Sequence, residues 1–188
     1  MGGTQRLSIG SLVKRINLFF QASFFLFLLV RPAFAETAVE YWREGNDFLH
    51  QGNFDQAIVE YSKAIDTDPN LAGVYDDRGV AYAQEGSYTR AVDDFTMAIA
   101  SNPNDADAYN NRAHAYADEG KQESALIDYG MAIRINPIYL NAYKNRAELY
   151  FQMKDLDHTW ADVFKIEELG GTIDPDFYKE LKKAVPHQ

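Results

Sequence analysis

The stretch AGVYDDRGVAYAQEGSYTRAVDDFTMAIASNPND, residues 72–105, runs directly into ADAYNNRAHAYADEGKQESALIDYGMAIRINPIY, residues 106–139. The two stretches carry tyrosine, arginine, alanine, glycine and proline at matching places, 34 residues apart. The same spacing extends to both sides and relates Pro69, Pro103 and Pro137, and likewise Tyr41, Tyr75, Tyr109 and Tyr143. Such a period is typical of proteins in which one short structural unit repeats and stacks on its neighbours.

Each unit predicts two helices joined by a short turn. In residues 72–105, Tyr75, Gly79 and Tyr82 are spaced for one face of a first helix, and Ala91, Phe95 and Ala98 for one face of a second. A glycine with left-handed backbone is expected where each first helix ends, at Gly52, Gly86 and Gly120. Asp-Pro or Asn-Pro pairs then end the second helices, because proline cannot continue a helix. Glycine and alanine at the matching positions let the two helix backbones of a unit approach closely.

These columns resemble the tetratricopeptide repeat, with tyrosine in place of its tryptophan, and with Glu44, Arg78, Arg112 and Arg146 in place of its leucine. The resemblance implies an all-α fold, a right-handed solenoid of antiparallel helix pairs. The expected units are residues 38–71, 72–105, 106–139 and a degenerate fourth, 140–173, whose register after Lys154 is open. Residues 174–188 predict an amphipathic capping helix and tail that cover the last pair.

Several charged residues have a structural interpretation. Arg78, Arg112 and Arg146 recur in phase with Asp94, Asp128 and Asp162, which predicts an ion pair inside each of three hairpins. The pairs Asp76-Asp77 and Asp93-Asp94 are interpreted mainly as solvated helix faces, because adjacent helical residues diverge by about 100°. Asp66, Asp68 and Asn70 resemble the start of a calcium loop, but Leu71 occupies the position that needs glycine, which favours a turn between repeats.

The first 35 residues predict a cleavable signal peptide. Lys14 and Arg15 precede an uncharged, mostly Phe and Leu segment at residues 16–30, and Ala33-Phe34-Ala35 has the form of a cleavage site. Fifteen helical residues span roughly 22 Å, less than a bilayer core of about 30 Å. We therefore expect an exported protein, periplasmic or secreted from a bacterium, and retention of the segment as an anchor is the alternative. The chain contains no cysteine, so it cannot form disulfides there.

The composition excludes several classes of partner. Residues 36–188 carry 14 basic and 28 acidic side chains, a formal charge of −14. Nucleic acid and anionic membrane surfaces both repel such a charge, so we expect neither partner once the signal is cleaved. No nucleophile motif, phosphate loop or metal-ligand spacing occurs, which predicts a protein that is not an enzyme and has no cofactor and no metal.

The resemblance also implies that the first helices line a concave groove that binds a peptide or a partner helix. Helical spacing assigns these residues to the groove: Trp42, Asn46, Asp76, Asp77, Val80, Asp107, Asn110, Asn111, His114, Asn141 and Lys144. Trp42 is either an anchor for the ligand or a lid on the first hairpin. The aspartates predict a ligand that contains Lys or Arg.

Chaperone-binding members of the family hold a peptide carboxylate with two Lys, two Asn and a further basic residue. Only Asn46 matches that set, because Trp42, Asp77, Asp107 and Asn111 stand at the other four places. The sequence therefore predicts a non-catalytic protein-interaction module or scaffold without this clamp. Two alternatives stay open, namely a self-assembling structural protein that forms a homo-oligomer, and a carrier of a small ligand such as a glycan or a metal.

Overall fold

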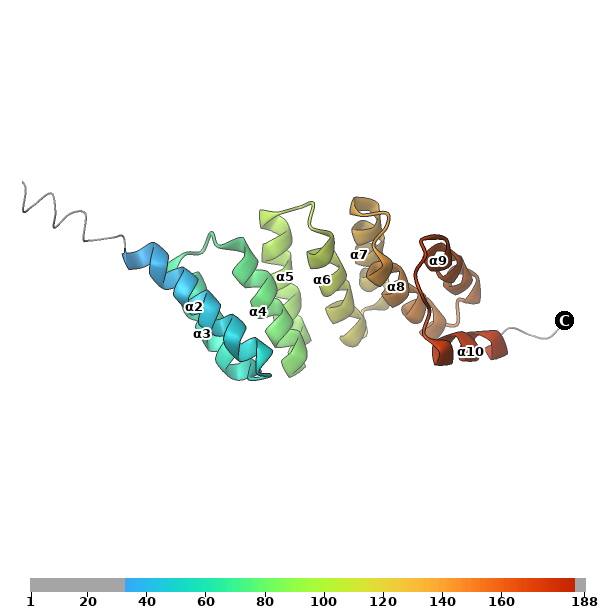
Figure 1. The fold of residues 1–188 in the computed structure, drawn as a ribbon, viewed down its shortest axis with the longest axis horizontal. Coiled ribbons are helices and arrows are strands. Elements are labelled where there is room, and N and C mark those ends of the chain that lie inside the picture. Colours follow the sequence, from blue (N-terminus) through green and yellow to red (C-terminus); the bar gives the residue numbers. More distant parts are fainter. Residues whose placement is uncertain (1–32, 185–188) are drawn as a thin grey trace, which may run out of the picture.

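The structure, a computed structural model, describes residues 33–184, with their side chains except those of residues 33–36 and 72. These residues form nine α-helices and no strand (Figure 1), which confirms the all-α prediction. The helices are α2 (Ala33–His50), α3 (Phe54–Thr67), α4 (Ala72–Glu85), α5 (Tyr88–Ser101), α6 (Ala106–Asp118), α7 (Gln122–Ile135), α8 (Leu140–Gln152), α9 (Leu156–Glu168) and α10 (Pro175–Ala184). The predicted basic and apolar parts of the signal peptide lie outside the described residues.

The first eight of these helices pack in consecutive pairs, α2 with α3, α4 with α5, α6 with α7 and α8 with α9. The pairs stand in a row along the long axis of the molecule (Figure 1). Each first helix also contacts the first helix of the next pair, whereas the second helices within residues 33–184 show no comparable contact with one another. The row therefore bends with α2, α4, α6 and α8 on its inner side.

Left-handed residues end the first helices of all four pairs. Gly52, Gly86 and Gly120 have φ angles of 74°, 84° and 82°. The fourth place in this column is Lys154, with a φ of 62°, the one non-glycine residue with positive φ in the described chain. A side chain in this conformation is strained by its Cβ, so the fourth pair keeps the turn geometry at a cost.

The core repeats with the period. Small residues on each first helix face a large side chain on the second helix of the same pair. A Cβ built on Gly45 would lie 2.5 Å from Tyr61 Cε1, and one built on Gly79 would lie 2.7 Å from Phe95 Cε1. In the fourth pair Thr159, Val163 and Ile166, all fully buried, occupy the columns held earlier by alanine and aromatic residues, which settles the register after Lys154.

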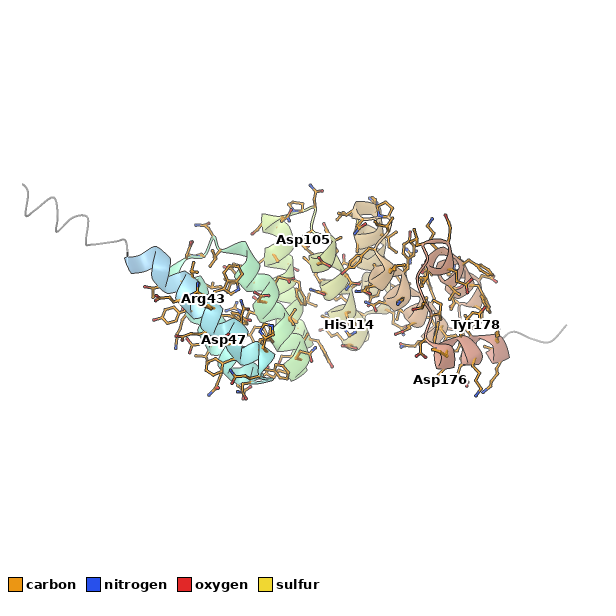
Figure 2. All side chains as sticks on the ribbon, in the orientation of Figure 1. Arg43, Asp47, Asp105, His114, Asp176 and Tyr178 are labelled. Carbon is orange, nitrogen blue, oxygen red and sulfur yellow. The ribbon has the colours of Figure 1, made fainter. Side chains whose placement is uncertain are left out.

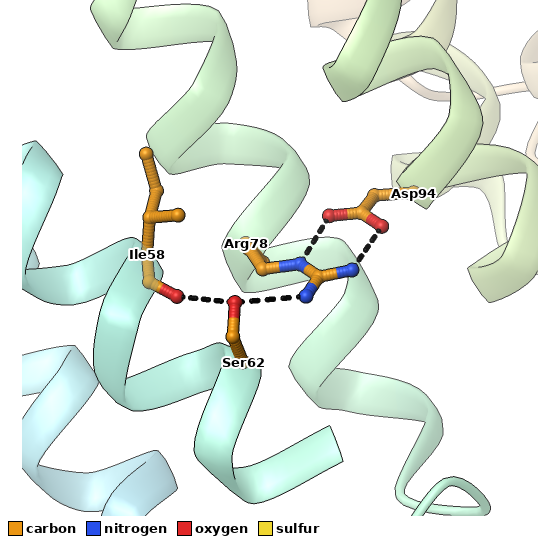
Figure 3. A network of polar contacts seen from close by, with 4 residues as sticks. All are labelled: Ile58, Ser62, Arg78 and Asp94. Atoms are coloured by element: carbon orange, nitrogen blue, oxygen red, sulfur yellow. Dashed lines mark hydrogen bonds and ion pairs between the residues drawn. The ribbon is translucent and has the colours of Figure 1, made fainter. Parts of the chain in front are cut away.

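The predicted ion pairs are present in three hairpins. Arg78 Nε and Nη2 donate to the two carboxylate oxygens of Asp94 over 2.7 and 2.8 Å, and Arg112 and Arg146 bind Asp128 and Asp162 in the same forked way. Arg78 Nη1 also donates to Ser62 Oγ of the preceding pair over 3.0 Å (Figure 3). One guanidinium therefore joins its own hairpin to the previous one.

The last helix, α10, is oriented differently from the paired helices. Gly170, with a φ of 74°, and the bond from Gly171 N to Ile166 O end α9 without the Asn-Pro turn used before. In Figure 1, α10 then lies crosswise below the last pair. Its Phe177 meets the edge of Phe151 with ring centroids 5.3 Å apart, and Leu181 is fully buried. The capping helix therefore closes the core but does not continue the stack.

Candidate binding surface on the first helices

Hydrogen bonds join neighbouring first helices across the inner face, and their partners are 35 residues apart. Trp42 Nε1 of α2 donates to Asp77 Oδ2 of α4 over 2.6 Å. Asn111 Nδ2 of α6 donates to Asp76 Oδ1 over 3.5 Å, and Asn145 Nδ2 of α8 donates to Asn110 Oδ1 over 3.0 Å. Residues that are one repeat length plus one apart therefore contact each other across two successive first helices. We call this row of bonds the inner ladder.

Trp42 is held by its own fold. Its indole lies against α4, where a Cβ built on Gly73 would be 3.1 Å from Cζ2, and its only donor is bound to Asp77. The ring is half-buried. It therefore packs the joint between the first two pairs, and part of the ring stays accessible.

Carboxylates gather at the centre of the surface, between α4 and α6. Asp105 caps α6 by accepting the N–H groups of Asp107 and Ala108, and Asp107 accepts a hydrogen bond from the Tyr139 hydroxyl. Burial, opposed by the hydrogen bond from Asn111 and aided by the charges of Asp77, Asp105 and Asp107, raises the pKa of Asp76 to about 6. Asp76 is therefore half-protonated near pH 6, and a nearby cation favours its ionised form.

The prediction that Asp76 and Asp77 are solvated was wrong. Both are half-buried, because the neighbouring first helices α2 and α6 lie against this face of α4. Asp77 reaches back to Trp42, whereas Asp76 reaches forward to Asn111. Burial also raises the pKa of Asp77, and the Trp42 hydrogen bond opposes that shift.

The other residues assigned to the groove have mixed environments. Asn46 Oδ1 accepts the Tyr61 hydroxyl over 2.7 Å, Val80 packs against the cluster around Ala91 and Phe95, and Asn110 is buried. His114 (Figure 2) is exposed, with Nδ1 3.2 Å from Asp118 Oδ2. It borders a hollow of about 90 Å³ between α6 and α8 that Asn145 and Glu148 also line.

The far end of the surface carries a lysine beside carboxylates. Asn141 is exposed, and Lys144 is half-buried. Lys144 lines a hollow of about 100 Å³ together with Glu148 and Phe177 of α10. Carboxylates thus stand where α4 meets α6, and Lys144 stands beside Glu148 where α8 meets the cap.

The sequence interpretation missed Tyr139 and the inner ladder. Tyr139 lies in the turn before α8, and a turn residue has no helical spacing to assign it to a face. Burial raises its pKa, and the bond to Asp107 adds to that shift. The ladder could have been found by comparing residues 35 apart, because Trp42 and Asp77, and Asp76 and Asn111, are complementary donor and acceptor pairs.

Residues 33–184 hold no group of three or more histidines and carboxylates placed to bind a metal ion. Over the same residues, no helix combines the length and the apolar character that crossing a membrane requires. The surface offers hydrogen-bonding and charged groups on helices that their own neighbours hold in place.

Comparison with solved structures supports the fold. The first TPR of Spaghetti (RPAP3), bound to the HSP90 peptide SRMEEVD, is 27% identical with a TM-score of 0.61, and the match covers 63% of this chain and 94% of that one. The second TPR domain of human RPAP3, in complex with the HSP70 peptide SGPTIEEVD, is 25% identical with a TM-score of 0.60, over 62% and 97% of the two chains. MamA, at 24% identity and a TM-score of 0.69 over 88% and 96%, shares the fold.

Family comparison agrees with the structure. No curated protein matches the chain. A family model described as TPR repeat matches residues 45–86 and 79–120, and one described as tetratricopeptide repeat matches residues 106–139. The matched residues run without a break from 45, within the first helix pair, to 139, at the end of the third. The chain belongs to the tetratricopeptide repeat family.

Proposed function

We propose that this protein is a non-catalytic interaction module that binds a lysine- or arginine-containing peptide or helix on the inner face of α2, α4, α6 and α8. Peptide binding by the similar RPAP3 domains supports the class of function. The acidic centre formed by Asp76, Asp77, Asp105 and Asp107 supports the charge of the ligand, and it is the observation on which the proposal depends.

The surface carries negative charge, whereas binding an acidic peptide requires positive charge. Both peptides held by the RPAP3 domains end in Glu-Glu-Val-Asp. In this chain Asp77 and Asp107 occupy places where peptide-clamping relatives carry an asparagine and a lysine, and Asp76 lies beside them. Like charges across an interface oppose binding, so a ligand of the opposite charge fits this surface better.

Binding of such a ligand depends on pH through Asp76. Its carboxyl must be ionised to attract a cation, and its pKa of about 6 places half-ionisation near that pH. We expect affinity to rise between pH 5 and about 7.5 and to level off above. Since a bound cation favours the ionised form, binding near pH 6 releases protons.

The test compares two labelled heptapeptides, SRMEEVD and its charge-inverted form SRMKKVK, by fluorescence anisotropy. The variant Asp76→Asn/Asp107→Asn removes two inner-face charges. Asp93→Asn/Asp66→Asn is the matched control, because both of these carboxylates are exposed on the second helices α5 and α3. We expect the basic peptide to bind, the inner-face variant to weaken that binding at least tenfold, and the control to leave it nearly unchanged.

Equal binding of the two peptides, or an equal loss in the control variant, contradicts the proposal. The first result would show that the charge of the peptide does not determine its affinity. The second shows that the overall charge of the protein attracts the peptide without a defined surface.

We further propose that the protein acts outside the cytoplasm of a bacterium. The basic segment, the apolar run at residues 16–30 and the Ala33-Phe34-Ala35 sequence support export. The intact mass of the protein recovered from the cell envelope tests this. A mass that begins at Glu36 agrees with the proposal, and a full-length mass in the cytoplasm contradicts it.

A further inference from the structure

The outer face of the first helix departs from the repeat pattern. In the interior pairs, two small or aliphatic side chains of the first helix pack against the preceding pair and are buried: Val74 and Ala81, Ala108 and Ala115, Ala142 and Leu149. The equivalent residues of α2 are Glu40 and Asp47, and Glu44 stands in the arginine column. All three are exposed and recur at helical spacing on one face. The N-terminal end of the solenoid therefore presents a row of carboxylates.

The C-terminal end presents aromatic rings bordered by lysines. Trp160 and Phe164 of α9 lie in the columns that Val92 and Thr96 fill in α5, where the next pair packs. Tyr178 of α10, which lies crosswise, covers Trp160, with ring centroids 5.8 Å apart. Phe164 lies 5.5 Å from Trp160 and remains 60% exposed.

The lysines adjoin this patch directly. Lys182 Nζ lies 4.2 Å from the centroid of the Tyr178 ring, and Lys179 and Lys183 are exposed on the same helix. The contacts Phe164 to Trp160, Trp160 to Tyr178 and Tyr178 to Lys182 are continuous. A terminal cap that only protected the core would end in polar side chains, whereas this end keeps a large apolar ring in contact with water.

We propose that the C-terminal end of one copy, at Phe164, Trp160, Tyr178 and Lys182, binds the N-terminal end of a second copy, at Glu40, Glu44 and Asp47. Lys179 and Lys182 of α10 and the carboxylates of α2 carry opposite charge, whereas Lys183 is paired with Glu180 over 2.7 Å, so head-to-tail contact between these two patches is attractive. Head-to-head contact brings carboxylates together and tail-to-tail contact brings lysines together, and both are repulsive. Val39, next to Glu40 on α2, is 40% exposed and supplies apolar surface for Phe164.

The geometry of this contact determines the kind of assembly. The two surfaces differ, so the contact is heterologous and leaves one free end of each kind on every assembly. The result is an open row of copies that grows with concentration. The inner face of each solenoid is not used, so this contact is independent of the proposed peptide binding.

Sedimentation velocity on protein expressed from its full-length sequence tests the proposal with two end variants. Phe164→Asp blocks the C-terminal end, and Glu40→Lys/Glu44→Lys blocks the N-terminal end. Ile127→Asp is the control, because this α7 side chain is also exposed, at 67%, but lies at neither end. Circular dichroism verifies that each variant is folded. Ionic strength is varied from about 0.01 M to about 1 M, where the Debye length falls from about 30 Å to about 3 Å.

We expect the wild type and the control to associate with rising concentration, and more strongly at low salt. Each end variant alone should be monomeric. An equimolar mixture of the two should form one-to-one dimers that do not grow, because each variant keeps one intact end and the intact ends are complementary.

Three results overturn the proposal: a wild type that is monomeric at all concentrations, association that either end variant retains, and a mixture that fails to dimerise. Association through the N-terminal 32 residues or through the inner face would persist in the end variants and would therefore give the second result. Peptide binding by the Phe164→Asp variant is measured in parallel, so failure of this contact is distinguishable from failure of the proposed peptide site.

Discussion

The joint between the second and third helix pairs and the joint between the third and fourth share one 34-residue frame and differ in how their arginine binds the preceding pair. At the first, Arg112 binds Asp128 with two nitrogens and Thr96 Oγ1 of the preceding pair with the third, over 3.1 Å. At the second, Arg146 binds Asp162 equally well, but the preceding pair offers Gly130. The bond that closes a hairpin is thus separable from the bond that links two hairpins.

The largest expected difference between the middle and the end of the chain concerns two phenylalanines. Phe95→Ala should lower the free energy of unfolding by about 3 to 5 kcal/mol, because the ring is 1% exposed and fills the second pair. Phe164→Ala should change it by less than about 0.5 kcal/mol. Urea unfolding followed by circular dichroism measures both. Similar losses would show that Phe164 is buried in solution.

The arginines give the direct comparison of the two joints. Arg112→Met should cost about 3 kcal/mol, because Asp128 keeps a charge in a nearly buried place and Thr96 loses a partner. Arg146→Met should cost about 1 kcal/mol less, since no bond to the preceding pair is lost. Urea unfolding followed by circular dichroism measures both variants. Equal losses of unfolding free energy would mean that the Thr96 bond contributes nothing measurable.

The acidic centre should destabilise the middle of the chain in a pH-dependent way. The folded-state pKa of Asp76, about 6, lies above the ordinary value of 3.8, so the folded chain binds this proton more tightly than the unfolded chain. The associated stability is present below about pH 4 and is lost as pH rises through about 6. Asp76→Asn should therefore stabilise the protein by about 1 to 2 kcal/mol at pH 8 and by little at pH 4. Asp93→Asn, on an exposed face, is the control and should show no such trend.

The weaker joint can be repaired. Gly130→Ser should raise the free energy of unfolding by about 1 kcal/mol, partly through helix propensity and partly through a bond to Arg146 Nη1. A Cβ built on Gly130 lies 3.9 Å from that nitrogen, so the hydroxyl has room. Gly130→Ala gains only the propensity. In an Arg146→Met background the serine should lose its bond contribution and the alanine should not change.

The smallest expected effect concerns the turn of the fourth pair. Lys154→Gly should stabilise the protein by about 0.5 to 1 kcal/mol, because glycine adopts a φ of 62° without a Cβ penalty. Gly120→Lys, the reverse change in the third pair, should destabilise by a similar amount. Thermal melts give the melting temperatures of both variants. Shifts of the same sign in the two variants would contradict this explanation of the turn.

The features that repeat were predictable from sequence, and those that interrupt the repeat were not. The spacing of 16 residues from Arg78 to Asp94 recurs three times, and the predicted ion pairs are all present. The orientation of α10 was not predictable, because Gly170 and Gly171 occur once and set the chain direction without a pattern. The burial of Asp76 was missed for a related reason, since it depends on the neighbouring first helix and not on the spacing within its own.

The network around Arg78 has a consequence for how the chain unfolds. Because each such guanidinium binds its own hairpin and the preceding one, opening one pair weakens the hold on its neighbour, and the first three pairs should unfold cooperatively. Cooperativity falls at Gly130, where this coupling is missing. The fourth pair and α10 should therefore open as a separate unit, and their amide protons should exchange before those of the middle of the chain.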